Sequence, residues 1–212
     1  MHTAKLAASL LVLLALTLAA APVHAETTNC TAITALPAVI TLQGIYCFTG
    51  HLNTSISSGN AIEIPTNNVV LDLNGFKLGG LAAGPGTQAN GIFATDRQNI
   101  TIKNETIRGF FEAIFLQDSG ASQGHVVEAI RADQNTLVGI EVQGSGNTFG
   151  QGSGFGLGID LSEVTGGLAI NNRITTADRG IDYGGSTGKY RDNVTFDVTA
   201  PYTGGTDIGN NN

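Results

Sequence analysis

Basic residues are scarce in this sequence, and their scarcity limits the partners that the protein can bind. The 212 residues include 10 Lys and Arg against 17 Asp and Glu, which gives a formal net charge of −7. Binding to a phosphate backbone normally needs a clustered basic face. The composition therefore argues against a nucleic-acid partner.

Cysteine is also rare, and both cysteines lie close together in the N-terminal part of the chain. Cys30 and Cys47 are the only two. In an oxidising compartment such a pair is expected to form a disulfide. The alternative is a metal site, but the only nearby histidine is His51, and two sulfurs do not complete a site. We therefore predict a Cys30–Cys47 disulfide.

No apolar stretch after residue 25 is long enough to span a bilayer. Residues 1–25 contain Lys5, then the apolar run LAASLLVLLALTLAAA, then the small-residue sequence VHA. This order is typical of a secretory signal peptide cleaved after Ala25, and a membrane anchor is the alternative. Cleavage would leave 9 basic and 17 acidic residues, a net charge of −8. The signal is bacterial in style, so we expect a secreted or periplasmic protein without stable membrane insertion after cleavage.

Helical periodicity is missing from the rest of the chain, and a short word recurs instead. The word consists of a small residue, an isoleucine, an acidic or aromatic residue and, in most copies, a larger apolar residue. Successive copies are separated by 30, 22, 26, 19 and 22 residues. Such recurrence indicates a repeat architecture. The copies are AIEI from Ala61, GIFA from Gly91, AIFL from Ala113, GIEV from Gly139, GIDL from Gly158 and GIDY from Gly180.

Short apolar alternations bounded by Gly, Asn, Ser and Asp predict strands joined by turns. Because no crossover helix is predicted, equivalent strands of successive repeats are expected to stack in parallel. The sequence thus predicts an all-β fold, a right-handed parallel β-helix solenoid of about six to seven short coils. We expect an N-terminal cap over residues 26–48, the β-helix over residues 49–198 and a polar tail over residues 199–212.

Two segments carry a resemblance to a known family. NNVVLDLNGFKLGG, from Asn67, and QNITIKNETIRGF, from Gln98, resemble the repeats of the right-handed parallel β-helix, pectin-lyase-like superfamily. The resemblance covers about residues 38–198 and implies the fold. It implies no single activity, because this superfamily includes lyases, hydrolases, epimerases, phage tail proteins and adhesins.

The third residue of each word is expected to point outward, because its apolar neighbours point inward. Adjacent strands lie ~4.8 Å apart, so these residues should form a column along the stack. Aromatic faces beside carboxylates suit sugars, whose C–H faces lie on rings while their hydroxyls bond the acids. We therefore predict a polysaccharide-binding flank. The column reads Glu63, Phe93, Phe115, Glu141, Asp160 and Asp182, and the last five are the predicted ligand-binding residues.

Three other interpretations of the three adjacent acids remain open. An outward strand position needs polar residues for solubility, so Glu141, Asp160 and Asp182 could serve only that purpose. Stacked like charges also disfavour full ionisation, and a calcium ion among these carboxylates would relieve the repulsion. Finally, two carboxylates can act as acid and base or nucleophile in a glycosidase, and Arg173 is a further catalytic candidate.

Known catalytic motifs are incomplete in this chain. The superfamily's polygalacturonases carry Asn-Thr-Asp, Asp-Asp, Gly-His-Gly and Arg-Ile-Lys, and the first two are absent here. His125 is followed by Val126, and Arg173-Ile174 is followed by Thr175, so neither half-match transfers a role. The sequence therefore favours polysaccharide binding without catalysis, with a small polysaccharide lyase or hydrolase, or a structural or adhesive surface module, as alternatives.

Overall fold

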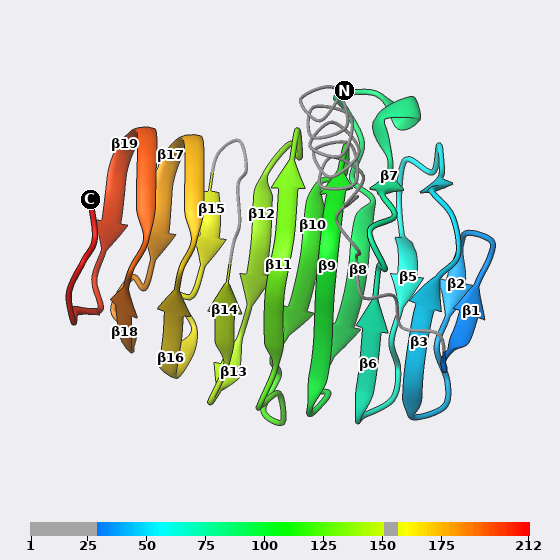
Figure 1. Ribbon diagram of the computed structural model, residues 1–212, viewed down its shortest axis with the longest axis horizontal. Helices are drawn as coiled ribbons and strands as arrows, with labels where there is room; N and C mark the ends of the chain where they lie inside the picture. Colours follow the sequence, from blue (N-terminus) through cyan, green and yellow to red (C-terminus); the bar gives the residue numbers. More distant parts are fainter. Residues whose placement is uncertain (1–28, 151–156) are drawn as a thin grey trace, which may run out of the picture.

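The computed structural model describes residues 29–150 and 157–212 (Figure 1). The predicted signal peptide and the first residues of the predicted cap lie outside the described residues. Within the described ranges, no helix is long and apolar enough to cross a membrane.

The strands form two sheets in which every pair is parallel, and the coils are stacked along the long axis of the molecule (Figure 1). The first sheet contains β1 (Thr31–Ile33), β3 (Gly44–Phe48), β4 (Leu52–Asn53), β6 (Val69–Asp72), β7 (Leu78–Gly79), β9 (Ile100–Arg108), β11 (Val126–Asp133), β13 (Gly144–Ser145), β14 (Thr148–Gly150), β16 (Val164–Ile170), β18 (Thr187–Arg191) and β20 (Thr206–Asp207). The second sheet contains β2 (Ala38–Val39), β5 (Asn60–Glu63), β8 (Asn90–Thr95), β10 (Glu112–Gln117), β12 (Val138–Val142), β15 (Leu157–Asp160), β17 (Arg173–Asp182) and β19 (Val194–Thr203).

This arrangement confirms the predicted all-β parallel solenoid, which makes about six turns. The only helical element in the described residues is a short 3₁₀ turn, η1 (Leu81–Ala83), in the longest interval between two copies of the repeated word.

The core is built from ladders of apolar side chains that repeat from coil to coil. The isoleucine of each repeated word pairs with its equivalent in the next coil, and all six are at most 1% exposed. Burying each such side chain is worth ~1.5–3 kcal/mol, and no coil could bury this surface without its neighbours. The ladder consists of Ile62, Ile92, Ile114, Ile140, Ile159 and Ile181.

The first residue of each word is small because it also faces the interior. A Cβ atom at Gly91 would lie 2.5 Å from the carbonyl oxygen of Ala113 and 3.1 Å from Cδ2 of the buried Phe110. At Gly158 it would lie 2.7 Å from the carbonyl oxygen of Gly180. Two consecutive inward positions interrupt the alternation of the strand. Asn60 and Asn90, which immediately precede the first two words, are partly exposed.

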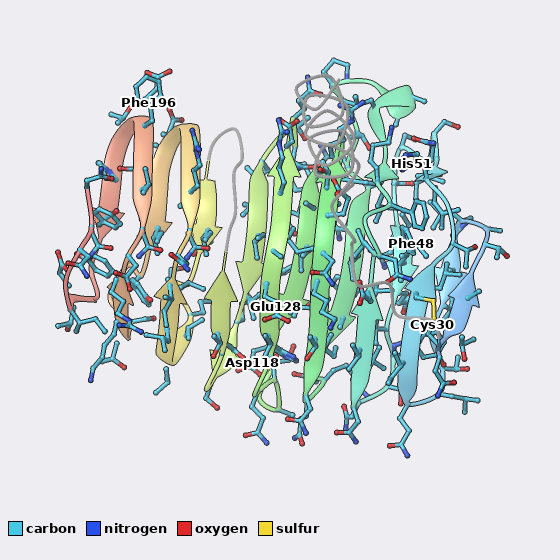
Figure 2. All side chains as sticks on the ribbon, viewed as in Figure 1. Cys30, Phe48, His51, Asp118, Glu128 and Phe196 are labelled. Atoms are coloured by element: carbon cyan, nitrogen blue, oxygen red, sulfur yellow. A yellow bond between two sulfur atoms is a disulfide. The ribbon has the colours of Figure 1, made fainter. Side chains whose placement is uncertain are left out.

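The N-terminal coil carries the predicted disulfide, which the structure confirms. Cys30 immediately precedes β1 and is bonded to Cys47 of β3, with 5.8 Å between their Cα atoms (Figure 2). β1 and β3 are also parallel neighbours in the first sheet. The disulfide therefore fixes the first coil covalently.

At the other end of the solenoid, the strands extend into residues 199–212. β19 reaches Thr203, and β20 pairs with β18. Stacked tyrosines fill this end of the core. The ring of Tyr190 lies 6.2 Å from that of Tyr183 and 4.7 Å from that of Tyr202. The hydroxyl group of Tyr183 donates a hydrogen bond to the carbonyl oxygen of Lys189 (2.7 Å), so this buried polar atom has a partner.

Candidate functional site

The structure places the predicted outward residues in one continuous column on the second sheet. The strand register aligns each of them with the next, without a shift, from β5 to β17. This register follows from the isoleucine ladder, because the column residue comes directly after each isoleucine. We call this set the outer column; it consists of Glu63, Phe93, Phe115, Glu141, Asp160 and Asp182.

Two aromatic rings occupy the middle of the outer column. Phe93 and Phe115 are partly exposed, and their ring centroids lie 5.6 Å apart with an interplanar angle of 58°. Polar side chains stand on either side of them. Asn90 donates to Oδ1 of Asn60 (3.2 Å), and Thr95 donates to Oε1 of Gln117 (3.1 Å). Rings flanked by amides can offer both stacking surface and hydrogen-bonding groups to a sugar.

Glu141 and Asp160 follow the rings and are also partly exposed. Gln143 donates to Oε1 of Glu141 (2.7 Å), and the backbone N–H of Ser162 donates to Oδ1 of Asp160 (2.9 Å). Burial raises the pKa of Glu141, an effect that the charge of Asp160 strengthens and the hydrogen bond from Gln143 opposes. Both carboxylates are thus held by local donors while part of each residue stays accessible.

Asp182 differs from its neighbours because it is only 3% exposed. The guanidinium group of Arg179, three residues earlier on β17, forms an ion pair with its Oδ2, and the N–H of Gly184 donates to its Oδ1 (2.8 Å). Asp182 is therefore less available to a ligand than an outward register position suggests. Arg173 lies at the opposite end of β17, so Arg179 is the arginine that joins the acidic part of the outer column.

Glu112 is an additional acidic residue on this flank. It is the first residue of β10 and is 6% exposed, and its Oε2 atom has no hydrogen-bond partner in the described structure. Burial raises the pKa of Glu112 to about 7, and the charges of Glu141 and Asp160 contribute to the rise. In the sequence, Glu112 could have been noticed as the acidic residue directly before the word AIFL. Simple strand alternation, however, predicts that its side chain points inward.

A polar hollow of about 350 Å³ lies at the corner that follows the second sheet. Its lining includes Asp118, which follows β10, and Glu163, which follows β15 (Figure 2 labels Asp118). The charge of Glu163 contributes to the raised pKa of Glu141, so the hollow and the acids share one electrostatic environment.

Ser122 also lines this hollow and contacts His125, but the pair is not arranged for nucleophilic catalysis. Nδ1 of His125 accepts the N–H of Ile100 (3.3 Å), so a neutral ring carries its proton on Nε2. Nε2 lies 2.9 Å from Oγ of Ser122, and in this tautomer it donates to the hydroxyl group. Burial lowers the pKa of His125 to about 4, which keeps the ring neutral. Because Nε2 donates, it cannot accept the serine proton.

The calcium prediction at Glu141, Asp160 and Asp182 stays a prediction. Within residues 29–150 and 157–212, no group of three or more His, Cys, Asp or Glu is placed to hold a metal ion. Each of the three carboxylates instead accepts a hydrogen bond from the protein.

Comparisons with known proteins give no further assignment. No protein-family model, curated protein or solved structure matches the chain.

Proposed function

We propose that the protein is a secreted or periplasmic member of the pectin-lyase-like β-helix superfamily that binds a polysaccharide along its second sheet. The observation that carries this proposal is the register of the outer column, which places two partly exposed rings in line with two accessible carboxylates. The Cys30–Cys47 disulfide is compatible with an oxidising compartment.

The shape of the flank suits an extended polymer better than a small molecule. The outer column repeats once per coil, with ~4.8 Å between strands, so equivalent groups recur along a straight line. A glycan chain lying along this line would meet rings, amides and acids in succession. Phe115 and Glu141 are adjacent in the register, so a single sugar unit could contact both.

Binding is tested by titrating the protein without residues 1–25 against a panel of neutral, acidic and basic polysaccharides, with isothermal calorimetry as the readout. Phe93→Ala and Phe115→Ala should each weaken binding about tenfold or more, because a stacked ring contributes contact area that alanine lacks. Phe196→Ala is the matched control. Phe196 is 74% exposed near the start of β19 (Figure 2), and β17, β15 and β12 separate that strand from β10 and β8, which carry the two rings. Unchanged affinity in both ring variants would refute the proposal.

A polysaccharide hydrolase is the second candidate, and Glu112 is the observation that favours it. A carboxylic acid with a pKa of about 7 can protonate a leaving glycosidic oxygen, while a nearby carboxylate such as Glu141 or Asp160 acts as base or nucleophile. The test is release of new reducing ends from the same panel, with calcium and with a chelator. Turnover that Glu112→Gln abolishes would establish the hydrolase, and a dependence on calcium would support the metal prediction.

A further inference from the structure

One oxygen of the Glu112 carboxyl group receives no hydrogen bond in the described part of the protein. The residue is 6% exposed, and no donor reaches its Oε2 atom. A buried polar atom without a partner destabilises the folded state, and more so when it is charged. Such atoms are uncommon in folded proteins, and an unfilled ligand site is one explanation for them.

The surroundings of Glu112 define what kind of donor would suit it. The charges that act on it are those of the Glu141 and Asp160 carboxylates. In the described part of the chain, no Lys or Arg forms an ion pair with Glu112, Glu141 or Asp160. The charge of Arg179 acts on Asp160, but a neutral hydroxyl group would leave Glu112 and Glu141 without a compensating positive charge. A primary ammonium group supplies both the donors and the missing charge.

The rings determine which ammonium compound fits the flank. Phe115 lies three residues after Glu112 on β10 and pairs with Phe93, so an apolar stacking surface adjoins the acids. A flexible polyamine needs no such surface. A pyranose ring with an amino substituent presents a C–H face and a cation on one rigid unit. The net charge of −8 after signal cleavage further favours a cationic polymer and disfavours uronic acids.

We propose that the flank selects a cationic glycan, a polymer of 2-amino-2-deoxy sugars with free amino groups, and that one ammonium group binds at Glu112, with the charges of Glu141 and Asp160 on the next two strands adding to the attraction. This inference rests on the proposed polysaccharide binding and specifies its substrate class. Because Oε2 is buried, the Glu112 side chain would have to rotate toward the flank to accept a hydrogen bond from the ammonium group, while an adjacent sugar face would stack on Phe115.

The experiment compares three hexasaccharides on the protein without residues 1–25: β-1,4-linked glucosamine, its fully N-acetylated form, and galacturonate. Calorimetry at low and at physiological ionic strength gives the affinities. We expect the glucosamine hexamer to bind about tenfold or more tightly than the acetylated form, because an ammonium–carboxylate hydrogen bond is stronger than a neutral one. The galacturonate hexamer should bind most weakly.

Glu112→Gln removes the charge but preserves the shape, and it should reduce the preference for glucosamine to about twofold or less. Glu128→Gln is the matched control, since it removes the same charge from an exposed position on β11 (Figure 2). The control should keep the preference of the unmodified protein. A loss of preference in both variants would mean that net charge alone attracts the cation, and it would overturn the assigned site.

The remaining outcomes separate this inference from the proposed function. Equal binding of the glucosamine and acetylated hexamers would overturn the ammonium site and leave polysaccharide binding standing. No binding of any saccharide to folded protein would overturn both. Hexalysine is the last probe. If it binds as tightly as the glucosamine hexamer and Phe115→Ala weakens neither ligand, the partner is a basic peptide and the glycan assignment fails.

Discussion

Two buried groups should give the stability of this protein opposite dependences on pH. Glu112 has a pKa raised to about 7 from an ordinary 4.5, and His125 has a pKa lowered to about 4 from an ordinary 6.5, both mainly by burial. Between pH 4.5 and 6.5 the folded protein holds the proton on Glu112, whereas the unfolded chain holds it on His125. The two states therefore bind equal numbers of protons at these two residues, and the two effects on stability cancel.

Single substitutions would reveal how each of the two groups makes the free energy of unfolding depend on pH. In Glu112→Gln only His125 remains, and the free energy of unfolding should rise by about 1.4 kcal/mol per pH unit across this window. In His125→Asn only Glu112 remains, and the free energy should fall at a similar rate as the pH increases. Because the pKa of Glu141 is also raised, this residue makes the free energy of unfolding fall slightly with increasing pH in every variant. Above about pH 8, Glu112→Gln should be more stable than the unmodified protein by roughly 3 kcal/mol.

The assay is urea denaturation followed by far-ultraviolet circular dichroism at a series of pH values. Glu128→Gln serves as the control for losing one negative charge, because Glu128 is exposed on β11. A curve for Glu112→Gln that runs parallel to that of the unmodified protein between pH 4.5 and 6.5 would refute the reasoning. It would mean that the Glu112 carboxyl group is as well solvated in the folded state as in the unfolded chain.

Three further predictions concern the architecture, and urea denaturation at neutral pH tests each of them. Replacing both Cys30 and Cys47 by Ala should lower the free energy of unfolding by roughly 3 kcal/mol, since the disulfide closes a loop with a sequence separation of 17; an unchanged value would show that the cap is rigid without it. Gly180→Ala should lower the free energy of unfolding by about 1–3 kcal/mol, because the new Cβ atom would lie 2.3 Å from the carbonyl oxygen of Pro201. A Cβ atom at Gly185 has open space, so Gly185→Ala should leave the stability nearly unchanged. Equal losses of stability in the two variants would contradict the steric account. Tyr183→Phe removes a buried hydroxyl donor to a carbonyl of β18 and should cost about 1 kcal/mol, and no loss would indicate that this hydrogen bond is not formed in solution.

The fold and the register of the outer column could be predicted because one sequence feature determines both. An isoleucine at a fixed place in every copy specifies the core ladder, and parallel stacking then aligns the residue that follows it. Phe93, Phe115, Glu141 and Asp160 are placed together for this reason. The disulfide was predictable because the chain contains only one possible pair of cysteines.

Other parts of the site depend on features that alternation does not reveal. The charges of Glu141 and Asp160 act on Glu112, although simple alternation would turn its side chain toward the core. The next two residues, Ala113 and Ile114, are both buried, and the pattern of residue types does not reveal that interruption. The ion pair of Asp182 depends on the conformation of Arg179, a long side chain that is itself partly exposed to solvent. Arg173 carries the same charge on the same strand, so composition and spacing could not distinguish the two arginines.

The stacked tyrosines at the end of the solenoid give the molecule a built-in optical reporter. The chain has four tyrosines and no tryptophan, and three of the four are Tyr183, Tyr190 and Tyr202. Tyrosine fluorescence will therefore arise mainly from the last coils, without the stronger emission of tryptophan. Because each coil contacts only its neighbours, fraying from this end can occur while the N-terminal coils persist. On one sample, tyrosine emission would then report unfolding of the C-terminal coils, while circular dichroism would report the strands of the whole solenoid, with no added dye.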